Sequence, residues 1–228
     1  MTVILVLATF VAFLLIDHFM NRGRAPVFIA QTGSRREPAA APILQPSLAG
    51  GFKVPESFRF HPGHTWALSE SPNLVRIGVD DFASKLVGDK IEAVQLPQRG
   101  QWIRQGQRVW CVIRNGQKIE MVSPIEGSVA DVNDELVKNP TLLNKDPYGE
   151  GWMVTVQSPD AKTNFRNLMG GALARWWTEE SSSRLMKKLP GTMGALALAQ
   201  DGGVAAKDLT SSLTDDKVVE IAKEFFLT

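Results

Sequence analysis

The stretch from Val109 to Gly127, VWCVIRNGQKIEMVSPIEG, decides the fold of this chain. Two runs rich in β-branched and other apolar residues flank the pair Asn115-Gly116. Both central residues of a type I′ turn need positive φ, and Asn-Gly is a pair that adopts it readily. Ser123-Pro124 then ends the second run, because proline cannot donate a ladder hydrogen bond. The stretch therefore predicts a tight β-hairpin with Asn115 and Gly116 at its tip.

Short strands separated by turn residues continue on both sides of this hairpin, from residue 58 to about 160. Apolar side chains recur at every second position over residues 74–79, which is the period of a half-buried strand. Asp80 or Asp81 predicts the start of a short helix that Gly88 ends. Further elements are expected as strands at 90–96, 102–113, 128–132 and 153–157, and as a helix after Asn133. The pattern indicates a mainly β domain with flanking helices, of the α+β class.

The composition and the candidate ligands exclude several functional classes. The 228 residues are 44% hydrophobic and carry a net charge of +1, so no basic field favours nucleic acid. The single cysteine, Cys111, excludes an intramolecular disulfide, and its hydrophobic strand predicts core packing. His61 and His64 are too few for a tetrahedral metal site. We find no spaced Ser-His-Asp or Cys-His arrangement, so we expect no catalytic and no metal-binding residues.

Four motifs between residues 58 and 160 resemble those of the glycine cleavage system H protein family, in the same order. They are HTWA at 64–67, IGVDDFA at 77–83, SPIEG at 123–127 and NKDPYGEGW at 144–152. Members of that family are lipoyl-carrying shuttles. The resemblance implies a barrel-sandwich hybrid of the lipoyl-domain type over residues 58–160. It also implies a protein that is not itself an enzyme.

The lysine that carries lipoate in that family has no counterpart at the matching position. It lies seven residues before the serine of the Ser-Pro pair, and counting back from Ser123 reaches Gly116. Glycine has no amine, so it cannot form the amide that holds lipoate. Lys118 is the nearest amine, and we expect it to pair across the hairpin with Ile113 rather than to lie at the tip.

Two functional hypotheses follow from this substitution. In the first, the module carries no cofactor and is a non-catalytic binding or scaffold subunit. Its hairpin then offers a small basic contact formed by Arg114, Asn115 and Lys118. In the second, the chain is a lipoyl-carrying swinging-arm shuttle of a glycine-cleavage-type system, with lipoate on Lys118 or another lysine.

The amino-terminal residues predict a membrane anchor. The run Val3–Ile16 is almost wholly apolar, and its extension to Met20 approaches the length that a bilayer core needs. The arginines that follow the run mark a cytoplasmic flank. We therefore expect an anchor at 1–20 with membrane contact through residues 3–20, a Pro/Ala/Gly-rich linker at 21–57, and a single-pass protein whose domain is cytoplasmic.

The residues from 161 to 228 predict a helical carboxyl-terminal extension. One helix is expected from about Asn164 past Trp176, ended by the three serines at 181–183, with a second short helix after them. Thr214 predicts the cap of a last helix over 215–226. The extension carries a sizeable apolar load, which packs in the core or forms a docking face for an unknown protein partner. Its members are Trp176, Trp177, Phe225 and Phe226.

Overall fold

The computed structural model describes residues 47–189, 205, 209–210 and 213–227. The expected membrane segment at 3–20 and most of the expected linker lie outside these residues. Among the residues that are described, no helix is long and apolar enough to cross a membrane.

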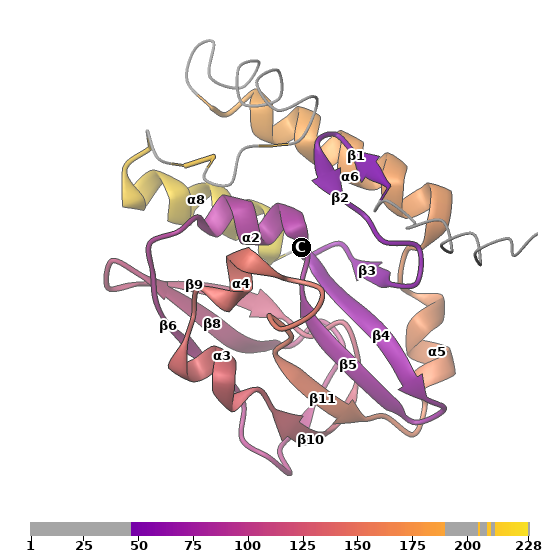
Figure 1. The fold of residues 1–228 in the computed structure, drawn as a ribbon. Coiled ribbons are helices and arrows are strands. Elements are labelled where there is room, and N and C mark those ends of the chain that lie inside the picture. Colours follow the sequence, from indigo (N-terminus) through magenta and orange to yellow (C-terminus); the bar gives the residue numbers. More distant parts are fainter. Residues whose placement is uncertain (1–46, 190–204, 206–208, 211–212, 228) are drawn as a thin grey trace, which may run out of the picture. The chain divides into compact units, whose positions relative to one another are not determined.

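A six-stranded antiparallel sheet forms one half of the fold, in the strand order β3–β4–β5–β11–β10–β7 (Figure 1). The central strands β5 and β11 are buried on their core-facing sides by alternate apolar residues. The strands of this sheet are β3 (Arg59–His61), β4 (Thr65–Ser71), β5 (Leu74–Val79), β7 (Trp102–Ile103), β10 (Gly127–Val132) and β11 (Val154–Gln157).

The predicted hairpin forms the second sheet, in the order β6–β8–β9. Its strands are β6 (Ile91–Gln95), β8 (Arg108–Arg114) and β9 (Gln117–Val122). The turn has φ of 46° at Asn115 and 72° at Gly116, as a type I′ turn requires. Ile113 lies opposite Lys118 in the register, so both the turn and the expected pairing are confirmed.

Helices surround the two sheets, and local capping signals set where several of them start. Asp80 caps the first helix by accepting a hydrogen bond from the Ala83 amide at 2.8 Å. Asn133 caps the second in the same way, through the Leu136 amide at 3.1 Å. The helices are α2 (Asp81–Val87), α3 (Asp134–Lys138), α4 (Leu142–Lys145), α5 (Ala161–Arg166), α6 (Gly171–Met186) and α8 (Asp215–Phe226).

The aromatic residues of the sequence motifs hold the six-stranded sheet to the loop after α4. The indole of Trp66 donates to the Pro147 carbonyl at 3.1 Å. Gly78 lies so close to this ring that a Cβ there would be 2.6 Å from it. The hydroxyl of the half-buried Tyr148 donates to the Lys53 carbonyl at 2.7 Å, and desolvation raises its pKa well above the usual range. Motifs far apart in the sequence therefore meet as one packing unit.

The linker predicted for residues 21–57 extends too far, because its last part belongs to the folded domain. Residues 48–53 form a small two-stranded sheet, β1 (Leu48–Ala49) and β2 (Phe52–Lys53). The Phe52 ring is fully buried and lies 4.9 Å from the ring of Phe82. Burial of an aromatic side chain stabilises a fold by a few kcal/mol, so this segment is not a loose tether.

The carboxyl-terminal helices also differ from the prediction. The single helix expected here is divided into α5 and α6, and Gly171 takes φ of 56° at the start of α6. The serines expected to end a helix lie inside α6, and Ser182 donates to the Gly50 carbonyl at 2.8 Å. A Cβ on Gly50 would lie 2.6 Å from Ser182, so small residues let helix and strand approach closely. The serines are therefore packing residues here and not a stop signal.

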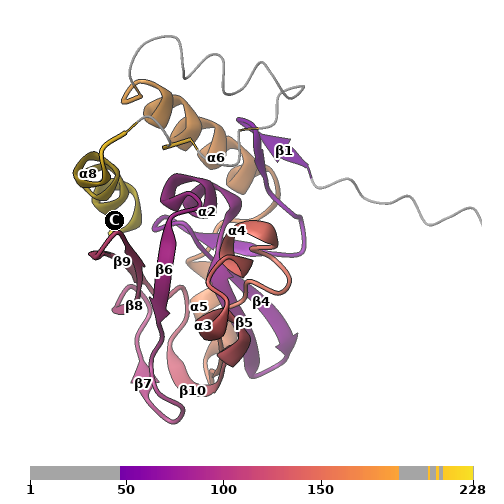
Figure 2. The same ribbon diagram turned by 60° about the vertical axis from the view of Figure 1, so that its left-hand side comes forward.

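Helix α8 packs into the main core, beside α2 and along β9 (Figure 2). Phe225 is 2% exposed and Phe226 is 0% exposed, so the proposal that they dock a partner is wrong. Trp177 is half-buried, with its ring 4.4 Å from that of His64. Trp176 differs from these three, since it is 62% exposed.

We expect Phe226→Ala to lower the free energy of unfolding by about 3–5 kcal/mol, because it removes a fully buried ring and leaves a cavity. Urea denaturation of the purified protein measures this change. Trp176→Ala is the matched control on an exposed aromatic, and it should change stability by less than about 1 kcal/mol. Equal effects of the two substitutions would contradict the core position of α8.

Candidate functional site

The hairpin tip contains the position at which the resemblance places the lipoyl-bearing lysine. Gly116 lies at the tip and is exposed, and a Cβ built on it would meet no atom within 4 Å. Its amide donates to the Glu92 carboxylate at 3.0 Å. The tip is therefore open to solvent at Gly116, and no amine extends from it.

Arg114 lies on the strand just before the turn, and its side chain points inward. It shares a strand face with Val112 and Trp110, two and four residues away, which are buried. Arg114 is 0% exposed. Its expected role as an exposed basic contact is therefore wrong, while Asn115 and Lys118 do lie on the surface.

The buried guanidinium of Arg114 is held by groups from three other parts of the chain. Nε donates to Asp215 Oδ1 at 3.0 Å, in the first turn of α8. Nη1 donates to the carbonyl of Val87, the last residue of α2, and to Thr210 Oγ1 at 3.2 Å. A buried charge is tolerated only when it is paired and hydrogen-bonded, so these contacts fix the geometry around the tip.

The first turn of α8 also binds the side chains on either side of Gly116. Asn115 donates to Asp215 Oδ2, and Gln117 donates to Asp216 Oδ1. Acidic residues at the start of a helix are further stabilised by the helix dipole. The sequence predicted that the last helix starts at residue 215, but nothing local indicates that Asp215 and Asp216 reach the hairpin tip.

These contacts lower the pKa of Asp215. The largest cause is the hydrogen bond from Asn115, followed by that from Arg114. Both hydrogen bonds favour the ionised carboxylate. The contact between α8 and the tip is therefore favoured when Asp215 is charged.

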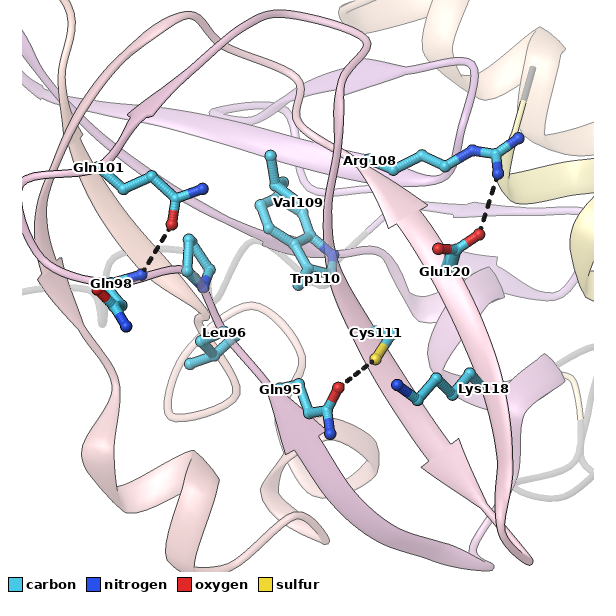
Figure 3. Close-up of a pocket in the computed structure, with 11 residues that line it drawn as sticks. Gln95, Leu96, Gln98, Gln101, Arg108, Val109, Trp110, Cys111, Lys118 and Glu120 are labelled. Atoms are coloured by element: carbon cyan, nitrogen blue, oxygen red, sulfur yellow. Dashed lines mark hydrogen bonds and ion pairs between the residues drawn. The ribbon is translucent and has the colours of Figure 1, made fainter.

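Lys118, the alternative attachment residue, lies on the outer face of the hairpin sheet and not at the tip. Figure 3 shows its side chain beside Cys111 and Gln95, along the wall of a shallow cavity of about 440 Å³. Cross-strand pairing places Glu120 next to Cys111 on the same sheet. A group attached to Lys118 would start over the sheet surface.

Cys111 stays a thiol in this setting. Its Sγ lies 3.2 Å from Gln95 Oε1, and it is buried as predicted. Burial is the largest influence and raises the pKa of the thiol, against a smaller lowering by Lys118. Because the thiolate is the reactive form, this setting disfavours a reactive Cys111.

The two histidines of the HPGH stretch have separate structural roles. His64 Nδ1 lies 2.8 Å from Asp80 Oδ2, and its ring stacks on Phe82 at 3.9 Å. His61 accepts the Gly63 amide at Nδ1, and burial lowers its pKa. Over the described residues, no group of three or more His, Cys, Asp or Glu side chains could hold a metal ion.

Comparisons with known proteins agree with the motif resemblance. A family model described as glycine cleavage H-protein matches residues 58–180. The glycine cleavage system H protein of Anaeromyxobacter sp. (strain K) is 35% identical over 128 residues, which are 56% of this chain and 98% of that protein. The H protein of Coprothermobacter proteolyticus is 35% identical over 108 residues, 47% of this chain and 84% of that protein.

A solved structure is also similar. The crystal structure of a glycine cleavage system H protein from Mycobacterium marinum matches with a TM-score of 0.46 and 24% sequence identity. The match covers 56% of this chain and 98% of that one.

We expect the stabilising effect of Asp215 to depend on pH. Its folded-state pKa is lowered, so its contribution is present above the ordinary aspartate pKa of about 4 and is lost as pH falls through the folded value. Asp215→Asn should lower the urea midpoint at pH 7 and lower it progressively less below about pH 4. A midpoint difference of the same size at pH 3 and pH 7 would contradict this linkage.

The control for this measurement is Glu220→Gln. Glu220 lies on the exposed side of the same helix and pairs only with Lys217 among the contacts described. Exposed pairs of this kind contribute about 0–1 kcal/mol, so this variant should shift the midpoint little.

Proposed function

Because this chain belongs to the glycine cleavage H-protein family, we propose that it serves as a non-catalytic binding module built on the family's fold, without lipoate. The observation that carries the proposal is the glycine at the hairpin tip. Gly116 occupies the position where the resemblance places the carrier lysine, and its backbone takes the positive φ that suits glycine.

The side chains next to the tip support the same proposal. A carrier tip must enter the active sites of the enzymes that load and unload its cofactor. Here Arg114, Asn115 and Gln117 are bound to Asp215 and Asp216 of the same chain. The tip is thus committed to an internal contact, which suits a scaffold better than a shuttle.

The alternative is a swinging-arm carrier with lipoate on Lys118. The Lys118 side chain is exposed, so its amine is accessible to a modifying enzyme. Lys118 lies within β9, however, opposite Ile113 and beside the wall formed by Gln95 and Cys111. An arm attached there starts from the sheet face, with less freedom to sweep than one attached at a hairpin tip.

We also propose that the module is tethered to a membrane with its domain on the cytoplasmic side. The support is the apolar run at residues 3–20 followed by arginines. A partner protein is then recruited at the membrane face. The exposed Trp176 of α6, together with Leu173 one turn before it at 56% exposure, is the contact surface we assign to that partner.

We expect no lipoyl-sized mass gain when the full chain is expressed in cells that supply lipoate and its ligases, because the tip has no amine. Intact mass spectrometry measures this directly. The Anaeromyxobacter H protein, expressed in parallel, controls for the activity of the ligases. A lipoyl adduct on this chain that disappears in Lys118→Arg would reject the scaffold proposal and support the carrier.

We expect the full chain to pellet with membranes and a variant lacking residues 3–20 to remain in the supernatant. The anchor is the only apolar run in the sequence that approaches the length of a bilayer core. Fractionation with and without carbonate washing distinguishes an integral anchor from surface attachment. A full-length chain that stays in the supernatant would show that the tether is wrong.

A further inference from the structure

Helix α8 lies outside the part of the chain that the family model matches. The match ends at residue 180, and α8 begins at Asp215. Even so, the helix lies along β9, with its first turn at the hairpin tip and its last turn near His64 (Figures 1 and 2). An added helix thus covers one side of the hairpin that bears the tip.

We propose that the first turn of α8 and the hairpin tip together form a clasp. The clasp blocks lipoylation at the tip and prevents the tip from entering a partner's cavity. The term clasp denotes Asp215 and Asp216 together with the tip side chains that they bind, Arg114, Asn115 and Gln117. The proposal rests on the proposed function, in which the tip has no amine to modify. It adds a second barrier to lipoylation that does not depend on the missing lysine.

The polar contacts of the clasp are specific to the tip. Asp215 uses one oxygen for Arg114 and the other for Asn115, so both sides of its carboxylate are occupied. Asp216 binds Gln117, the first residue after the turn. Residues on both strands are therefore held to one helix start, and hydrogen bonds to a charged group are stronger than neutral ones.

The apolar contacts of α8 hold its first turn next to the hairpin tip. The helix buries the face formed by Val218, Ile221, Ala222 and Phe225. The Phe225 ring lies 5.1 Å from that of Phe82 in α2. Because this apolar face contacts the core apart from the first turn, we expect α8 to stay docked when the acidic residues are replaced, even though Arg114 loses its ion pair.

The clasp predicts that a lysine introduced at the hairpin tip would be poorly modified. A modifying enzyme must surround the tip to bring an amine to activated lipoate, and α8 occupies one side of it. The lipoate carboxylate attacks the α-phosphorus of ATP and releases pyrophosphate, which gives the acyl-adenylate. The neutral lysine amine then attacks the acyl carbon, and AMP and a proton leave as the amide forms. A lysine at position 116 would project into solvent, but its flanking residues would remain bound to α8.

The test compares two full-length variants in cells that supply lipoate and its ligases. The first is Gly116→Lys with Lys118→Arg, which offers an amine at the tip and removes the nearest other one. The second adds Asp215→Ala and Asp216→Ala, which opens the clasp. Peptide mass spectrometry reports lipoate at residue 116 specifically, and Glu220→Ala in place of the two aspartate changes is the matched control on the same helix.

We expect the first variant and its Glu220→Ala control to be lipoylated at less than about one-tenth of the level of the clasp-open variant. Equal lipoylation of the closed and open variants would overturn the proposal. Absence of lipoate from both would also overturn it, because opening the clasp would then not expose the tip. Every variant in this comparison carries the lysine at the same positive-φ position. Backbone strain at residue 116 therefore cannot cause a difference in lipoylation between them.

Hydrogen exchange gives a second readout that does not depend on any ligase. In the otherwise unaltered chain, Asp215→Ala with Asp216→Ala should speed amide exchange of residues 109–122 by about tenfold, because several charge-assisted hydrogen bonds are lost. Unchanged exchange would overturn the clasp. The proposed function fails by a different result, a lipoyl adduct on the unaltered chain, so the two failures are distinguishable.

Discussion

The buried guanidinium of Arg114 is the interaction on which the arrangement around the hairpin depends. A charge in the interior is costly unless hydrogen bonds and an opposite charge compensate for it. Here the compensation comes from the end of α2, from Thr210 and from the start of α8. Four segments are thereby fixed relative to one another, and the strand that leads to the tip cannot move without leaving a charge unpaired.

This constraint also holds the residues on either side of the hairpin tip. The turn itself keeps the geometry of a tight two-residue hairpin, with positive φ at Asn115 and Gly116. Its flanking side chains, Asn115 and Gln117, are hydrogen-bonded to the first turn of α8 although they lie at the surface. The core and the tip depend on different residues, so the family's core can be present in a chain that has glycine at position 116.

Local sequence signals predicted the elements well where the cause is itself local. The Asn-Gly turn and the caps at Asp80 and Asn133 all depend on residues within a few positions. Prediction failed where a distant contact decided the outcome. The serines expected to end a helix lie inside α6, where Ser182 contacts Gly50 between β1 and β2. The sequence left open whether Phe226 packs in the core or docks a partner, and the return of α8 to the core decides this.

The sequence by itself determined the type I′ hairpin, its resemblance to a lipoyl carrier and the absence of an amine at residue 116. Each of these depends on residue identity and short spacing. Only the tertiary structure decided that Arg114 points inward and meets Asp215, because the two lie 101 positions apart. The direction of a strand side chain is set by which sheet face is buried, and that is a property of the assembled core.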